Sequence, residues 1–264
     1  MLTAVKNQIK VNLLSVKYNL MREMTNHVTF LMNVSFMVLN NATFIIQWIL
    51  LFHLRKDIGG YSLEDIMLLW GLSASTYGLS HIFFQQAYSL PWLIMNGKLD
   101  SYLVQPKNVL LGIITSATNS SAVGDLIYGY LVLVLFKFSL RNLLLFTLFS
   151  ILGALIMTAF AVIAGSISFY LVRGDILAEN LNNILVHFCT YPDTIFKESV
   201  RLILYVVVPT GFVVYLPMKI MIHYQPLYLF AVLGFAAVII SLAFLLFYRG
   251  LRRYTSSNLM MARI

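Results

Sequence analysis

Residues 89–112 read SLPWLIMNGKLDSYLVQPKNVLLG, and long apolar segments lie on both sides of them. Gly97 permits a sharp turn, and Asp100 follows it at a position where a carboxylate can cap a short helix. Pro106 ends that helix or opens the next one. We therefore predict a short helix between two turns, held at the surface of a membrane.

The apolar segments set the class of the protein. Of 264 residues, 60% are hydrophobic and only 11% are charged, whereas a soluble globular chain has about 25% charged residues. A spanning helix needs roughly 20 mostly apolar residues. We therefore predict an all-α integral membrane protein with six transmembrane helices and no large soluble domain.

The six predicted spans lie within residues 28–248, at 28–52, 66–90, 110–138, 143–171, 200–217 and 227–248. The third contains Asp125, which either pairs with a base or breaks the span into a surface helix and a shorter crossing. Pro209 is expected to kink the fifth. His81 in the second is either a proton relay or, by default, an interhelical hydrogen-bond partner.

Two further segments have apolar residues at helical spacing. Residues 1–27 predict an amphipathic helix in the lipid interface, with lysines beside the face formed by Val5, Ile9, Leu13, Val16 and Leu20. The alternative is a solvated helix packed on a partner. Residues 176–188 predict a second interfacial helix or a cytoplasmic helix on a partner, ended by Pro192.

The basic residues indicate the orientation. With six spans, the side that carries both termini holds 13 of the 18 Lys and Arg residues, and the other side holds 5. The positive-inside rule then places both termini, residues 97–106 and the tail 249–264 in the cytoplasm. The formal charge of +8 is thus explained by topology, and no basic patch interleaved with aromatics points to nucleic acid.

Catalytic and metal-binding motifs are missing from the sequence. Gly97-Lys98 is followed by Leu99, and Trp92 stands where a phosphate-binding loop has its first glycine. There is no HExxH or GxSxG, and the five histidines lack ligand spacing. With one cysteine, Cys189, no disulfide can form within the chain. We expect no enzyme, metal site or cofactor in this chain.

The run NGKLDSYLVQPKN at 96–108 resembles the signature of a group of ABC-2 type permeases, the membrane subunits of ATP-driven exporters. The matching residues are Gly97, Lys98, Leu99, Asp100, Tyr102, Leu103 and Pro106. The resemblance implies one ABC-2 (type V) exporter-like domain over 1–264 that opens with an elbow helix. It also implies that these residues dock on a separate ATPase subunit, which holds ATP and Mg, and that a second permease copy, identical or related, completes the machine.

The expected function is therefore export across the cell membrane of a hydrophobic or amphipathic cargo such as a drug, lipid or peptide. One alternative is an ion-coupled secondary transporter or channel, although Asp125 is the one acid in the predicted span interiors. A second alternative is a scaffold or immunity protein that binds a partner and transports nothing. The residues of the substrate path are not assigned by the sequence.

Overall fold

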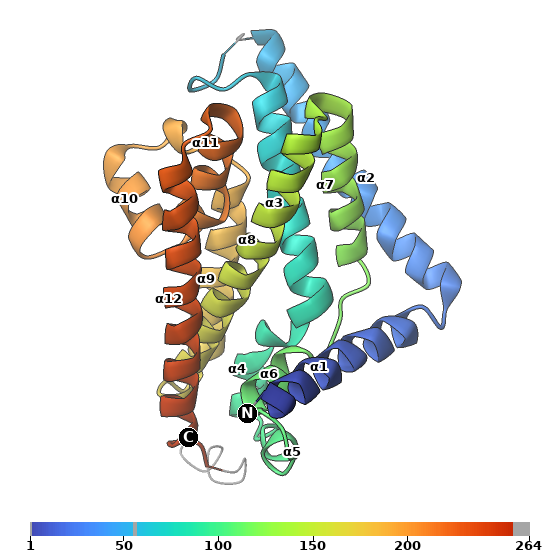
Figure 1. Ribbon diagram of the computed structural model, residues 1–264, viewed down its shortest axis with the longest axis vertical. Coiled ribbons are helices and arrows are strands. Elements are labelled where there is room, and N and C mark those ends of the chain that lie inside the picture. Colours follow the sequence, from blue (N-terminus) through green and yellow to red (C-terminus); the bar gives the residue numbers. More distant parts are fainter. Residues whose placement is uncertain (1, 55–56, 256–264) are drawn as a thin grey trace.

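The computed structural model describes residues 2–54 and 57–255, and within these ranges the chain is helical and forms no strand. The long helices, shown in Figure 1, are α1 (Leu2–Glu23), α2 (His27–Leu54), α3 (Leu63–Phe84), α7 (Ala122–Lys137), α8 (Leu140–Ser166), α9 (Gly174–Cys189) and α12 (Pro226–Leu251). Shorter helical segments join them, namely η1 (Gln85–Ala87), α4 (Leu90–Met95), α5 (Asp100–Leu103), α6 (Val109–Ile114), η2 (Ile167–Phe169), η3 (Asp193–Ile195), α10 (Glu198–Val206), η4 (Gly211–Tyr215) and α11 (Leu216–His223).

Helices α3, α8 and α12 run between two ends of the molecule (Figure 1). We call the end that holds residues 96–108 the α5 end, and the end that holds Tyr61 the Tyr61 end. Among the described residues, α2, α12 and α8 extended by η2 are long and apolar enough to cross a membrane by themselves. With the bent pair Glu198–Val206 and Gly211–His223, the number of such spans rises from 3 to at most 4. The expectation of six spans is thus supported for part of the chain only.

The predicted continuous span at 110–138 is wrong, because the chain is broken between α6 and α7. The break is rich in hydroxyl and amide side chains, which bind backbone groups in competition with a helix. Thr118 Oγ1 donates to the carbonyl of Ile82 at 2.9 Å, and the backbone N–H of Asn119 donates to the carbonyl of His81 at 3.1 Å. The division into two helices that the sequence allowed at Asp125 is thus observed, as α6 and α7.

Asp125 itself lies in the first turn of α7, where the helix dipole favours an acid. It is buried and accepts a hydrogen bond from Asn41 Nδ2 at 2.6 Å. The basic partner allowed by the sequence is absent from its contacts in the described part of the chain. The contact joins α7 to α2.

Helix α9 covers the segment predicted as an interfacial or cytoplasmic helix. It begins at the α5 end, where Asp175 and Trp92 line one cavity. Just beyond its other end, Asp193 accepts a hydrogen bond from Tyr61 at 3.2 Å. Helix α9 therefore runs from the α5 end toward the Tyr61 end, beside α8 and α3.

The predicted fifth span at 200–217 is broken near its middle. Its two arms meet at 88°, and the break carries Pro209, which cannot continue a helix without a kink. Beyond it Gly211 lies directly against the ring of Tyr205, so the chain turns back where a side chain would overlap that ring. In α11, Lys219 Nζ contacts Asp193 at 3.0 Å, which places this arm at the Tyr61 end.

This arrangement changes the distribution of basic residues. Arg201 Nε donates to the backbone carbonyl of Asp193 at 3.3 Å, so Arg201 and the nearby Lys197 belong to the Tyr61 end. Moving these two residues changes the distribution of Lys and Arg from 13 against 5 to 11 against 7. The α5 end still has the larger number of basic residues, so the positive-inside rule still predicts that this end faces the cytoplasm.

Helix α1 lies across the α5 end against the break before α7 (Figure 1). Ser15 Oγ donates to the carbonyl of Thr115 at 2.9 Å, and Gln8 Oε1 accepts from the backbone N–H of Asn108 at 2.9 Å. Only part of the predicted apolar face packs against the protein. Val16 is buried, whereas Ile9 and Leu13 are 54% and 58% exposed. The exposed part is free to meet lipid, as the interfacial prediction requires.

Candidate functional site

The predicted short helix between turns is confirmed as α5. The chain leaves α4 through Gly97, whose φ of +64° is a left-handed conformation that glycine adopts without strain. Beyond the turn at Pro106, Asn108 caps α6 by accepting from the backbone N–H of Leu111 at 3.0 Å. The predicted cap at Asp100 is wrong, because Asp100 is the first residue of α5 and makes no capping bond.

The seven residues of the predicted ATPase-docking segment divide into two groups. Gly97 and Leu99 are buried, and Tyr102 is half-buried with its hydroxyl 2.9 Å from Ser116 Oγ. The exposed group comprises Lys98, Asp100, Leu103 and Pro106, joined by Val104, which is 84% exposed and was not predicted. The first group holds α5 in place and the second group faces outward.

The end of α12 lies next to this segment. Tyr254 packs edge-on against Phe169 with ring centroids 6.4 Å apart. Burial, with the neighbouring Asp100 carboxylate, raises the pKa of Tyr254 to about 12. Through Tyr254, the end of the chain after α12 therefore meets both Asp100 of α5 and Phe169 of η2.

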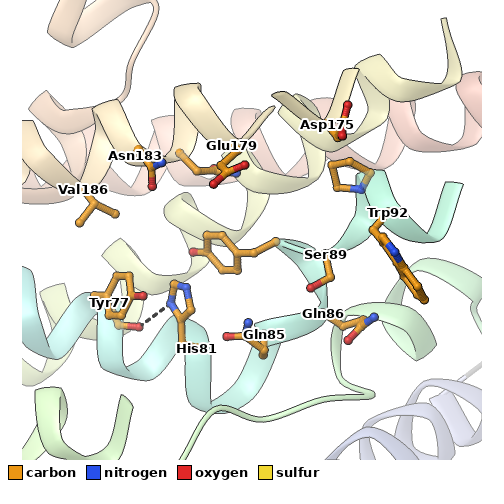
Figure 2. A pocket seen from close by; sticks show the side chains of 13 residues that line it. Tyr77, His81, Gln85, Gln86, Ser89, Trp92, Asp175, Glu179, Asn183 and Val186 are labelled. Carbon is orange, nitrogen blue, oxygen red and sulfur yellow. Dashed lines mark hydrogen bonds between the residues drawn. The ribbon is translucent and has the colours of Figure 1, made fainter. Parts of the chain in front are cut away.

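A cavity of about 640 Å³ lies at the α5 end of the bundle. Figure 2 shows its two walls, one from the last turns of α3 with η1 and α4, the other from α9. Its lining is Tyr77, His81, Gln85, Gln86, Tyr88, Ser89, Pro91, Trp92, Asp175, Glu179, Asn182, Asn183 and Val186.

The α3 wall is organised around His81, which is 5% exposed. Its ring is stacked between those of Tyr77 and Tyr88, at centroid distances of 3.8 and 4.0 Å. The Nδ1 atom lies 3.1 Å from the carbonyl of Tyr77 and 3.0 Å from Ser80 Oγ (Figure 2 draws the first contact). The interhelical hydrogen bond expected for His81 is therefore wrong, since both contacts lie within α3.

The α9 wall is a polar stripe that the sequence analysis did not assign. Asp175, Glu179, Asn182, Asn183 and Val186 recur at i, i+4, i+7, i+8 and i+11 and so share one helix face. The apolar residues of 176–188, on which the interfacial prediction rested, occupy the remaining faces. The helical spacing of these acids and amides was the available signal.

Helix α4 connects the cavity to the docking segment. Trp92 and Pro91 line the cavity, and Gly97 begins the turn into α5. The backbone N–H of Lys98 donates to the carbonyl of Leu93 at 2.9 Å, which ties the turn to α4. The cavity wall and the exposed face of α5 thus belong to one short continuous unit.

The comparison with known families covers both the docking segment and the cavity. Residues 38–258 match the model of the family described as ABC-2 family transporter protein. The matched region begins within α2 and includes α5 and both cavity walls. No curated protein and no solved structure gave a match. Together with its apolar helices, the match shows a membrane protein of the permease type found in ABC transporters. The chain belongs to the ABC-2 transporter family.

Proposed function

We propose that this chain is the membrane subunit of an exporter in the cell membrane, driven by a separate ATPase subunit that binds ATP and Mg. Membership of the ABC-2 family supports a permease that works with an ABC ATPase in general. The observation that carries the finer proposal is the continuity of α4, which joins the wall of a cavity to the exposed face of α5. Force applied to α5 would therefore reach the cavity directly.

In this proposal the ATPase contacts the exposed group of the docking segment, namely Lys98, Asp100, Leu103, Val104 and Pro106. The buried Leu99 and the Tyr102–Ser116 contact give this group a rigid base. Rigid attachment matters, because a flexible loop would absorb the movement of the ATPase instead of passing it to α4. Both termini and α5 lie in the cytoplasm, as the 11-to-7 excess of basic residues favours.

A second permease copy, identical or related, would face the open side of the cavity. Glu179 and Asn183 are exposed and Trp92 is 54% exposed, so one chain leaves this wall uncovered. Two such walls facing each other would enclose a path lined by both copies. Helix α9 crosses the membrane in this arrangement, and the polar stripe on it is shielded from lipid.

The test is purification of the tagged full chain in mild detergent, with mass spectrometry of the proteins that accompany it. We expect an ATP-binding subunit in stoichiometric amount, and its loss in the variant Leu103→Asp/Val104→Asp. The control is Ile195→Asp, which places an acid at a site 45% exposed at the Tyr61 end and should retain the subunit. Absence of any ATPase from the unmodified chain would contradict the proposal and favour ion-driven transport or a scaffold.

A further inference from the structure

The cavity between α3 and α9 differs in charge from the chain that forms it. The whole protein carries a formal charge of +8, yet the lining contains Asp175 and Glu179 and no lysine or arginine. Neither carboxylate forms an ion pair within the described residues. The cavity is therefore a region of uncompensated negative charge, which attracts a cation.

The buried polar atoms of the cavity lining that have no hydrogen-bond partner among the described residues are acceptors. Gln85 Oε1, Asp175 Oδ1 and Asn182 Oδ1 are buried and receive no hydrogen bond from any described residue. His81 is 5% exposed and has its Nδ1 engaged within α3, while its Nε2 has no such bond in the described part of the chain. Water in the cavity can bond the accessible polar atoms of the lining, among them those of the exposed Glu179, and a ligand that displaces this water must bring donors of its own.

The rest of the lining suits the apolar part of such a ligand. Tyr77, Tyr88 and Trp92 present aromatic rings, which bind both apolar groups and the face of a cation. A volume of about 640 Å³ falls in the range of roughly 300–1,000 Å³ that accommodates a small organic molecule. Size, aromatic surface, negative charge and unpaired acceptors thus point to one chemical class.

We propose that the cavity binds an organic cation that carries N–H donors, a protonated amine or guanidinium attached to an aromatic or aliphatic body. This inference rests on the proposed function, because it names the class of cargo. Asp175 and Glu179 neutralise the cationic group and, together with His81 Nε2, accept its N–H groups, while the aromatic rings hold the body. A quaternary ammonium has the same charge without donors and leaves these acceptors unsatisfied, so it binds less well.

The test measures ligand binding alone, by saturation-transfer NMR on the purified full chain in lipid nanodiscs. The probes are 4-phenylbutylamine, its N-trimethyl analogue and 4-phenylbutyrate. We expect the amine to bind, the trimethyl analogue to bind at least tenfold more weakly, and the anion not to bind. Asp175→Asn/Glu179→Gln should weaken amine binding at least tenfold, whereas Glu198→Gln, an acid removed at the Tyr61 end, should leave it unchanged.

Equal binding of the amine and the anion would overturn the inference, as would equal binding of the amine and its trimethyl analogue. Undiminished amine binding in the Asp175→Asn/Glu179→Gln variant would overturn it as well. If an ATPase copurifies but the amine does not bind, the exporter proposal stands and this inference fails. If the amine binds as expected and no ATPase copurifies, the cation site stands and the exporter proposal fails.

Discussion

The hydroxyl of Tyr102 lies 2.9 Å from the hydroxyl of Ser116 and fixes α5 against the break between α6 and α7. Leu99, just before α5, is fully buried in the main hydrophobic core. The segment with the permease signature therefore contains residues that support the fold beside residues that are free to contact a partner. Experiments on this segment must treat the two groups separately.

Leu99→Asp is expected to impair folding, because burial of an unpaired charged or polar group costs several kcal/mol. Tyr102→Phe should cost only about 1 kcal/mol, the value of one hydrogen bond. Thermal unfolding followed by size-exclusion chromatography in detergent measures both, with Lys98→Ala as the exposed control. An unchanged melting temperature for Leu99→Asp would contradict the assignment of Leu99 to the core.

Gly129→Ala is expected to destabilise the contact between α3 and α7. A Cβ at this position would overlap Ser75 Oγ and the backbone oxygen of Gly71, and overpacking of this kind costs about 1–3 kcal/mol. Gly234→Ala in α12 is the matched control, since nothing lies within 4 Å of its Cβ position. There the substitution should be neutral or stabilise the helix by up to about 1 kcal/mol. Equal melting temperatures for the two variants would refute the close packing of α3 on α7.

Lys219→Met is expected to destabilise the protein more than the double change Asp193→Asn/Lys219→Met. The side chain of Asp193 is 1% exposed and pairs with Lys219 at 3.0 Å, so loss of the lysine leaves a buried charge at a cost of about 3–5 kcal/mol. Neutralising both partners removes that penalty. A double-mutant cycle on melting temperatures measures the difference. Strictly additive effects would mean that the two side chains do not interact.

The course of α9 gives a prediction about topology. In a Cys189→Ala background, Val104→Cys and Ile195→Cys place single thiols at positions 84% and 45% exposed at the two ends of the molecule. A membrane-impermeant maleimide should label the second in intact cells and the first only in inverted vesicles. Labelling of both from the same side would show that α9 does not cross the membrane.

The sequence predicts α5 and its turns because local chemistry determines them. Gly97 supplies the left-handed turn and Pro106 limits the helix. Helix α12 begins at Pro226, one residue before the predicted span at 227–248, and proline is favoured in the first turn of a helix. Such features depend on the residue itself and on its near neighbours, so no tertiary information is required.

The course of α9 could not be predicted from hydropathy. Asp175, Glu179 and Asn182 lower the mean hydropathy of the helix, and all three line the cavity. Conversely, α10 is rich in apolar residues, and Leu202 and Val206 are 65% and 72% exposed, yet α10 and α11 do not form a straight span. Only the tertiary contacts of Asp193 with Tyr61 and Lys219 show where these segments lie.

The central claim is that α4 transmits movement from α5 to the cavity, and the most direct test follows a thiol on α4. In the Cys189→Ala background, Trp92→Cys places a thiol at the cavity rim, and its labelling rate is measured in the complex with the copurified ATPase. We predict that the rate changes when ATP binds, and that the change disappears when the ATPase contact is removed by Leu103→Asp/Val104→Asp. The same rate with and without ATP would contradict the claim.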